Sequence, residues 1–288
     1  MLEIEDVSQS YPDGTRALDG VTLSIGRGLF GLLGPNGAGK SSLMRVAATL
    51  QSPSGGQLRF DGIDVLAEPR TLRRRLGYLP QDFGVYPGIS AEMLFDQIAV
   101  LKGITGRGER RDAAERLLRL VNLWDVRGRA VSTFSGGMRQ RWGVAQALIG
   151  EPDLLILDEP TAGLDPAERN RFHELLFGLG ATAVVIVSTH IVDDVADLCG
   201  QVAVLAGGRI LAHDSPGVLA GALDRRVWRG PAESSVGTAT LLSRRLSGGR
   251  LSVRVLADER PGPDFEPVAA TLEDAYFAAL RHDEAPRS

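Results

Sequence analysis

The chain has 288 residues, of which 43% are hydrophobic and 24% charged, as in a soluble globular protein with one large domain and a smaller attachment. Its formal net charge of −4 argues against a protein that binds nucleic acid mainly by electrostatic attraction. The single cysteine, Cys199, excludes an internal disulfide and is interpreted as a small buried side chain near a helix end.

The chain is not expected to enter a membrane by itself. Its first residues, MLEIEDVSQSY, lack the basic and apolar regions of a signal peptide. The apolar runs LLIL and AVVIV have the length of strands, whereas a membrane-spanning helix needs about 20 apolar residues. Any role at a membrane therefore requires a partner.

The first 81 residues show short strands around one helix. Apolar runs bounded by turn residues predict the strands, and the run after a Gly-rich segment predicts the helix. The arginines from Arg70 to Arg75 indicate a solvated helix face, with binding to anionic lipid or RNA as the alternative. The expected elements are a strand and turn-rich hairpin over 1–25, a strand at 28–33, a helix at 40–50, and strands at 55–62 and 76–81.

From about residue 88 to 150 the pattern becomes helical, and strands return after it. Met138, Trp142 and Leu148 fall on one helical face, so they are expected in the core. Residues 202–212 predict a hairpin that turns at Gly207 and Gly208. The other expected elements are helices at 91–103, 109–124, 136–150 and 166–180, and strands at 153–160 and 183–190.

A change in composition after about Leu223 marks a second, smaller unit. Within it we expect a strand at 225–230, a helix near ATLLSRRL (239–246) and a strand at 250–257. The sequence TLED has the spacing of a capping box and predicts a last helix that starts at Thr271. The chain is accordingly divided into residues 1–222 and a small α/β appendage, residues 223–288.

The sequence GPNGAGKS matches the phosphate-loop pattern and lies between a predicted strand and a predicted helix. Glycines let successive N–H groups point at phosphate oxygens, and the helix N-terminus adds a partial positive charge. Lys40 is expected to reach the β- and γ-phosphates of ATP, and Ser41 to offer its hydroxyl to Mg²⁺. The expected nucleotide-binding residues here are Gly34, Pro35, Asn36, Gly37, Ala38, Gly39, Lys40, Ser41 and Ser42.

Two further segments carry chemistry. LLILDEP ends in two adjacent carboxylates: Asp158 is expected to support Mg²⁺, and Glu159 to polarise an attacking water. TFSGGMRQR, residues 133–141, places Ser and Gly at the start of a predicted helix, which is a second anion-binding site. One chain therefore carries two sites suited to phosphate.

In this order the phosphate loop, the SGG helix and LDEP resemble the nucleotide-binding subunit of ABC transporters, over about residues 1–222. The resemblance implies an α/β fold: a P-loop NTPase core of ABC type with an antiparallel β subdomain and a helical insertion at about 88–150. In this family two subunits pack head to tail around ATP. Ser135, Gly136 and Gly137 would then bind the γ-phosphate of the partner's ATP, and Met138 stands where the family usually has glutamine.

The same resemblance assigns four more residues. Tyr11 is similar to the aromatic residue that stacks on adenine, and Gln81 to the glutamine that senses Mg²⁺ and joins the core to the helical insertion. His190 is similar to the switch histidine that contacts the γ-phosphate. Asp165, which ends AGLD, would lie in the loop that crosses to the opposite subunit. The implied catalytic residues are Lys40, Gln81, Glu159 and His190, and the implied metal-site residues are Ser41, Gln81 and Asp158.

The sequence ATLEDAYFAAL resembles the closing helix of ABC-2 exporter subunits. It implies an ATPase that powers a separate membrane permease, most simply for export of a small molecule, drug, lipid or glycan, from the cytoplasmic face of the membrane. The alternatives are a soluble ABC-type ATPase acting on nucleic acid or ribosomes, an importer ATPase and, least favoured, a P-loop kinase. Long coiled coils or paired cores are typical of the first alternative, and larger β-rich extensions of the second.

The loop after Gln81, DFGVYPGIS, is expected to lie between the core and the helical insertion. Its side chains, with Met93, either line a groove for a short helix of the permease or pack internally. The residues concerned are Phe83, Val85, Tyr86 and Met93. The remaining histidines match no motif and are interpreted as surface residues: His173, His213 and His282.

Overall fold

The computed structural model describes residues 1–161 and 164–284. Its centre is a six-stranded sheet in the order β10-β9-β3-β8-β7-β6, parallel except for the β9–β10 hairpin. Strands β7 and β8 are buried along their whole length, because helices and the second sheet cover them, and so they are almost entirely apolar. The strands are β3 (Gly28–Leu33), β6 (Leu76–Leu79), β7 (Leu154–Asp158), β8 (Val184–Ser188), β9 (Gln201–Ala206) and β10 (Arg209–Asp214).

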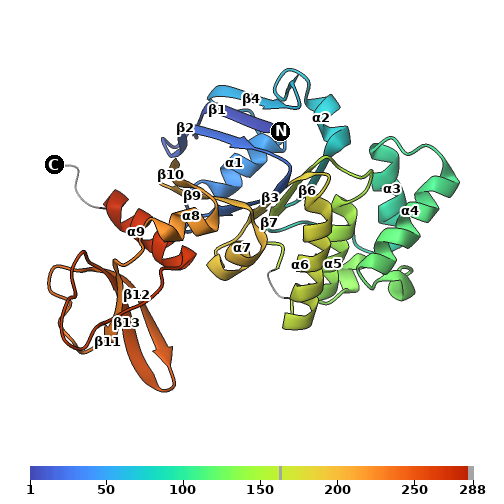
Figure 1. Cartoon of the computed structure of the whole chain (residues 1–288). Helices are drawn as coiled ribbons and strands as arrows, with labels where there is room; N and C mark the ends of the chain where they lie inside the picture. Colours follow the sequence, from blue (N-terminus) through green and yellow to red (C-terminus); the bar gives the residue numbers. More distant parts are fainter. Residues whose placement is uncertain (162–163, 285–288) are drawn as a thin grey trace.

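An antiparallel sheet lies beside this centre, at the top of Figure 1, in the order β2-β1-β4-β5. One hydrophobic cluster joins the two sheets through α1, with Phe30 and Phe60 among its most buried side chains. The elements are β1 (Leu2–Ser10), β2 (Arg16–Ile25), β4 (Gly55–Phe60), β5 (Ile63–Asp64), α1 (Lys40–Ala47) and α2 (Pro69–Arg75). The expected arginine-rich helix face is α2, where Arg75 also binds Asp61 and Asp153.

The chain between β6 and β7 forms a helical group at the right of Figure 1. As expected, Trp142 and Leu148 are buried, and Met138 packs against the same core. The elements are α3 (Ala91–Leu101), α4 (Arg107–Leu120), η1 (Trp124–Val126), η2 (Val131–Thr133) and α5 (Gly136–Ala147). Two helices of the central layer follow, α6 (Pro166–Gly180) and α7 (Val192–Leu198), and Cys199 is buried at the end of α7 as expected.

A four-stranded sheet, in the order β12-β13-β11-β14, lies at the lower left of Figure 1, and α9 lies between it and the central layer. Its elements are α8 (Pro216–Gly221), β11 (Val227–Pro231), β12 (Thr240–Ser247), β13 (Arg250–Leu256), β14 (Glu266–Pro267) and α9 (Leu272–Glu284). The last helix begins where the capping box predicted it. Thr271 Oγ1 accepts from the N–H of Asp274 at 3.3 Å, and the Thr271 N–H donates to Asp274 at 2.8 Å.

The prediction of a helix near residues 239–246 is wrong, because this segment is strand β12. It pairs with β13 through a turn at Gly248 and Gly249, whose φ angles of 57° and 77° suit a tight hairpin. Leu241 and Leu242 lie in separate hydrophobic clusters, as neighbours on a strand do. The Gly-Gly pair between two β-prone runs was the signal for this hairpin.

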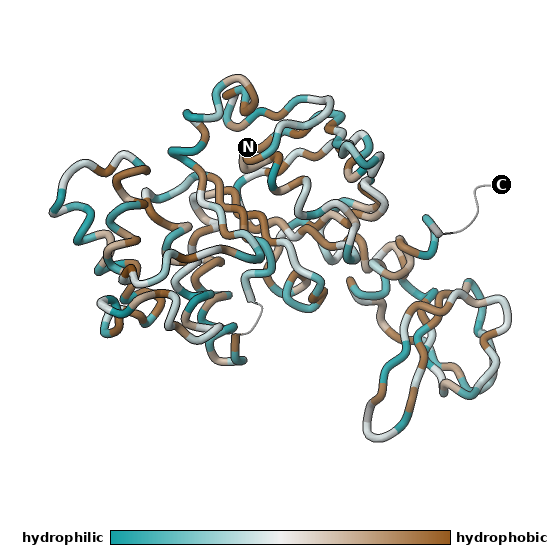
Figure 2. The backbone as a smooth tube through the Cα atoms, turned by 180° about the vertical axis from the view of Figure 1, so that it is seen from behind, coloured by the Kyte–Doolittle hydropathy of each residue, from teal (hydrophilic) through white to brown (hydrophobic). Residues whose placement is uncertain are grey.

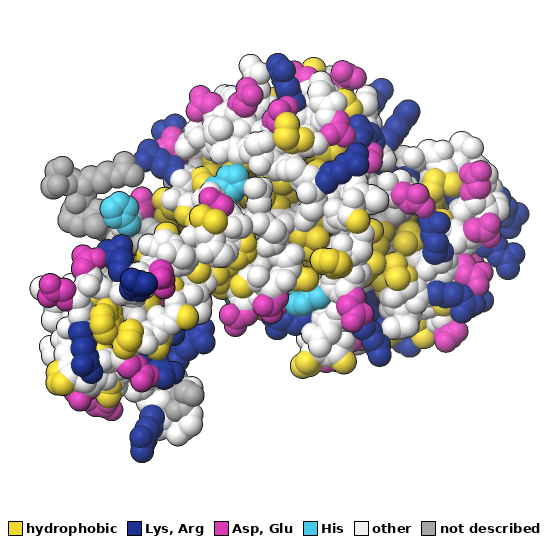
Figure 3. Space-filling view, in the orientation of Figure 1, with side chains coloured by type: hydrophobic (Ala, Val, Ile, Leu, Met, Phe, Trp, Pro, Cys, Tyr) yellow, Lys and Arg dark blue, Asp and Glu magenta, His cyan; other side chains and the backbone are white. Residues whose placement is uncertain are grey.

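The hydrophobic residues follow the central strands, which form the brown interior in Figure 2. On the face shown in Figure 3, basic and acidic side chains are interspersed rather than gathered into one basic patch. Over the two described ranges, 1–161 and 164–284, we find no helix with the length and apolar character needed to cross a membrane.

Candidate functional site

A cavity of about 360 Å³ lies at the edge of the central sheet where β3, β6 and β7 end. Parallel strands bring their carboxyl ends to one edge, so segments far apart in the sequence meet there. The cavity unites the phosphate loop with Tyr11, Gln81, Asp158 and Glu159. Its wall also contains three residues that the motifs did not indicate. The lining residues are Tyr11, Thr15, Arg16, Ala17, Pro35, Asn36, Gly37, Ala38, Gly39, Lys40, Ser41, Ser42, Gln81, Asp158 and Glu159.

Two glycines of the loop are required by space and conformation. A Cβ atom on Gly34 would stand 2.2 Å from the carbonyl oxygen of Leu205. Gly39 has a φ angle of +107°, and a Cβ there would stand 2.3 Å from the carbonyl oxygen of Ala17. Helix α1 begins directly afterwards at Lys40, so its first N–H groups face the cavity region.

Lys40 is 8% exposed, and its ammonium group donates to the carbonyl oxygens of Gly34, at 2.5 Å, and Pro35, at 3.1 Å. Burial lowers its pKa, although the nearby charges of Glu159 and Asp158 act in the opposite direction. Its hydrogen-bond partners are thus neutral carbonyl groups within the loop. A phosphate bound in this loop would give the Lys40 ammonium group a negatively charged hydrogen-bond partner.

Asp158 is 4% exposed and accepts a hydrogen bond from Ser41 Oγ at 3.1 Å. Burial raises its pKa, and the hydrogen bond from Ser41 partly offsets the effect. Within the described ranges no three His, Cys, Asp or Glu side chains gather as a metal site. Mg²⁺ commonly takes only one or two protein oxygens and completes its shell with water and phosphate, so Ser41 and Asp158 fit this ion.

Glu159 has a φ angle of 51°, a conformation that residues other than glycine rarely adopt. Its N–H donates to the carbonyl oxygen of Ser188 at 2.9 Å. One carboxylate oxygen lies 2.9 Å from His190 Nδ1, and the other lies 3.5 Å from Thr189 Oγ1. The backbone turn directs this carboxylate to the cavity and to His190, a contact that the separate motifs did not predict.

Tyr11 stands at the edge of the cavity. Its hydroxyl group lies 3.1 Å from Ser42 Oγ and donates to Gln51 at 3.2 Å. The hydrogen bond with Ser42 is the main reason why its pKa is lowered. The tyrosine is therefore tied to helix α1, which follows the phosphate loop.

The SGG segment does not line this cavity. Ser135 caps helix α5 by accepting the N–H of Met138 at 3.2 Å, and Ser135 and Gly136 are exposed, with Gly137 partly so. Asp165 caps α6 by accepting the N–H of Glu168 at 2.8 Å. The two residues before Leu164 in AGLD lie outside the described part of the chain. The start of α5 is open to a ligand from outside its own subunit.

The sequence motifs did not predict a buried polar cluster that lies beside the site. Asp194, on α7, is 5% exposed and accepts hydrogen bonds from Thr161, at 3.1 Å, and from Arg169. His173 Nε2 lies 3.6 Å from the same carboxylate, and its side chain is 18% exposed. Burial lowers the pKa of His173, opposed by Asp194. The expectation that His173 is a surface residue is wrong, because α6 turns it towards α7, whereas His213 and His282 are exposed.

The loop after Gln81 divides into two parts. Phe83 and Val85 pack against the core, and the Phe83 ring lies 6.1 Å from that of Trp142. Tyr86 and Met93 are 69% and 58% exposed. Phe83 and Val85 therefore pack internally, which is one of the two expected alternatives. Tyr86 and Met93 are exposed and can contact another molecule.

Comparison with known proteins agrees with this geometry. Residues 18–162 match the family described as ABC transporter. The chain is 38% identical over 251 residues to the daunorubicin/doxorubicin resistance ATP-binding protein DrrA of Streptomyces peucetius, covering 86% of this chain and 75% of that protein. It is 33% identical over 214 residues to the linearmycin resistance ATP-binding protein LnrL of Bacillus subtilis, covering 74% and 68%.

A dimeric ATP-binding cassette in a post-hydrolysis state, bound to ADP and Pi, superimposes with a TM-score of 0.70 at 26% identity, covering 75% of this chain and 98% of that one. The predicted α/β fold of ABC type is thereby confirmed. The chain belongs to the ABC transporter family and is one of its ATP-binding subunits.

Proposed function

We propose that this subunit hydrolyses ATP with Mg²⁺ to drive a separate membrane permease that exports a small, drug-like molecule. The observation that carries the proposal is the single cavity in which the phosphate loop faces Asp158 and Glu159. Export is favoured because the match to DrrA covers 86% of the chain, more than residues 1–222 alone, and so extends into the C-terminal unit. We also propose that residues 1–222 and 223–288 are separate domains, because the second part has its own four-stranded sheet and its own hydrophobic clusters.

In the proposed mechanism the loop N–H groups and Lys40 hold the phosphates, and Tyr11 stacks on adenine. Ser41 and Asp158, with Gln81, would hold Mg²⁺, which would neutralise charge on the phosphates. Glu159 accepts the proton of the attacking water.

The nearby His190, bonded to Glu159, orients the carboxylate and contacts the γ-phosphate. Ser135, Gly136 and Gly137 complete the site of a second subunit, and Asp165 lies at the same interface. Exposed Tyr86 and Met93 form our proposed contact with the permease.

The experiment compares Lys40→Ala with Lys102→Ala, a change of the only other lysine. Lys40→Ala removes the ammonium group inside the loop, so the affinity for ATP measured by calorimetry should fall by about tenfold or more, ~1.4 kcal/mol. Lys102 bonds instead to carbonyl oxygens at Arg73 and Leu76, and its variant should keep the wild-type affinity. Equal affinities for the two variants would contradict the nucleotide assignment.

The export proposal has its own test. The permease that co-purifies with the full chain should carry substrate outward in vesicles when ATP is supplied, and the Tyr86→Ala/Met93→Ala variant should lose the permease while it keeps ATP binding. Inward transport would support the importer alternative instead.

A further inference from the structure

Gln140 connects helix α5 to the loop that carries the proposed catalytic carboxylate. Its side-chain Nε2 donates to the carbonyl oxygen of Glu159 at 3.3 Å and to that of Pro160 at 3.0 Å. Because both acceptors are carbonyl oxygens, only the NH₂ end of the amide can face them. The bonds join two segments that are separated by 19 and 20 residues in sequence. Gln140 lies five residues after Ser135 on the same helix.

The two carbonyl groups belong to a strained turn. Glu159 has its φ angle at 51°, and such a conformation persists only where the surrounding structure holds it. On one side the Glu159 N–H bonds to Ser188. On the other side Gln140 holds the carbonyl oxygens of Glu159 and Pro160. The direction of the carboxylate, which ends 2.9 Å from His190 Nδ1, depends on this backbone.

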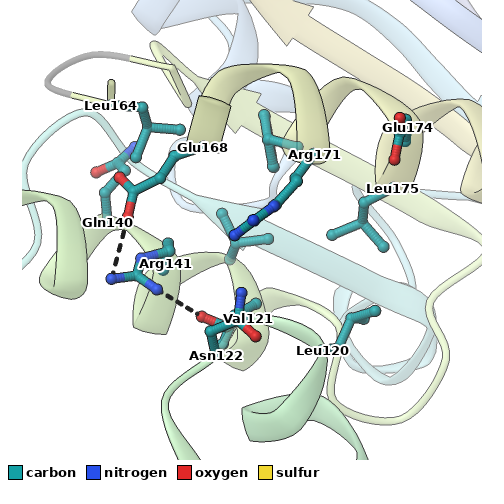
Figure 4. A pocket seen from close by; sticks show the side chains of 12 residues that line it. Leu120, Val121, Asn122, Gln140, Arg141, Leu164, Glu168, Arg171, Glu174 and Leu175 are labelled. Carbon is teal, nitrogen blue, oxygen red and sulfur yellow. Dashed lines mark hydrogen bonds and ion pairs between the residues drawn. The ribbon is translucent and has the colours of Figure 1, made fainter. Parts of the chain in front are cut away.

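The next residue fixes α5 to its other neighbours. Arg141 binds Glu168 of α6 at 3.1 Å and donates to the carbonyl oxygen of Val121, at the end of α4, at 3.0 Å. Figure 4 shows Gln140 and Arg141 near the start of α6, with Glu168 turned towards the arginine. A cavity of about 390 Å³ opens beside them, between α4, α5 and α6. Polar contacts therefore join α5 to α4, to α6 and to the loop of Glu159, in addition to the apolar packing of Trp142 and Val144 in the core.

We infer that Gln140 is a positioning residue: it makes the direction of the Glu159 carboxylate depend on the position of α5. The inference rests on the proposed function, in which the start of α5 binds the ATP of the partner subunit. In the dimer, Ser135 would contact the ATP of the partner subunit, whereas Glu159 would face the ATP of its own subunit. Less than two turns of α5, from Ser135 to Gln140, would link these two contacts. Gln140 itself does not line the nucleotide cavity; it reaches that cavity only through Glu159, whose carbonyl oxygen accepts its hydrogen bond.

The test uses the full chain with Gln140→Leu and Gln140→Glu, both of which remove the two N–H donors. We expect kcat for ATP hydrolysis to fall by about tenfold or more, since small errors in the position of a catalytic group are costly. The KM for ATP should stay within about twofold, because the phosphate loop is unchanged. Gln146→Leu is the matched control, since Gln146 is a partly exposed residue of the same helix with no bond to Glu159 or Pro160 among the described residues. It should keep the wild-type kcat.

A second measurement separates positioning from general support of α5. In the Glu159→Gln background, adding Gln140→Leu should cause little further loss of activity, because the carboxylate to be aimed is already absent. The double variant should still form the ATP-dependent dimer, since Ser135 and the start of α5 are intact. An additive loss, loss of the dimer or a wild-type kcat for Gln140→Leu would overturn the inference. Full activity of Glu159→Gln alone would instead overturn the proposed function.

Discussion

Asp158 is a residue whose charge is unfavourable in the folded chain before nucleotide binds. It is 4% exposed, and burial raises its pKa above the ordinary value of 3.8. A raised folded-state pKa favours the folded state below the unfolded pKa, and this contribution is lost as the pH rises through the folded pKa. At neutral pH the ionised carboxylate is therefore kept at a cost in stability, as residues that serve binding often are.

Replacing this carboxylate by an amide should show that cost. Asp158→Asn keeps an oxygen that can accept the hydrogen bond of Ser41 but carries no charge. We expect the nucleotide-free variant to be more stable at pH 7 by about 1 kcal/mol, with the difference shrinking towards pH 4. Urea unfolding at several pH values measures this difference. A variant less stable than the wild type at pH 7 would show that the charged form supports the fold.

At the scale of elements, α9 is joined to the C-terminal sheet by one buried carboxylate. Asp274 is 1% exposed, lies in the first turn of α9, and binds Arg254 of β13 at 2.6 Å. Burial raises its pKa, but hydrogen bonds from Arg254 and Thr271 outweigh this effect and lower it overall. Its contribution to stability is present above the unfolded pKa of about 3.8 and is lost as the pH falls through the folded value.

Asp274→Ala should therefore loosen α9 from the sheet. It removes the carboxylate that accepts hydrogen bonds from Thr271 at the start of the helix and leaves the Arg254 guanidinium without its ion-pair partner, so we expect a loss of about 3 kcal/mol at pH 7 and a smaller loss at pH 3. Denaturant unfolding followed by circular dichroism measures the change. Asp258→Ala is the control, because its pair with Arg226 is exposed and should contribute less than about 1 kcal/mol. Equal losses in the two variants would contradict this role of the buried pair.

The elements also show what the sequence could predict. Motifs with a local physical basis, such as the phosphate loop and the TLED cap, predicted both the element and its boundary. The prediction of a helix for segment 239–246 is wrong because a short run with three leucines fits the period of a helix as well as that of a strand, and only the pairing with β13 decides between them. The contacts of Gln140 with Glu159 and of His173 with Asp194 join residues 19 and 21 positions apart through the packing of whole helices. No local pattern indicates such contacts.

For the whole molecule, the question is what lies opposite the exposed start of α5. Ser135 is absent from the cavity of its own subunit, so a head-to-tail dimer is needed if its N–H groups are to meet a phosphate. Glu159→Gln keeps nearly the same side-chain volume but cannot accept a proton as a carboxylate does. ATP turnover should then fall by about a hundredfold or more, with ATP binding retained.

With ATP bound and uncleaved, each γ-phosphate would be held between Lys40 of one subunit and Ser135 and Gly137 of the other. The Glu159→Gln protein should therefore sediment as a dimer with ATP and mainly as a monomer with ADP. Adding Ser135→Arg should abolish the dimer but leave ATP binding intact, because the larger side chain blocks only the approach of the opposite α5. Ser215→Arg removes the equivalent cap of α8, far from the start of α5 in sequence, and should leave the dimer unchanged. A dimer that tolerates Ser135→Arg, or a monomer at saturating ATP, would mean that α5 does not reach a partner's nucleotide.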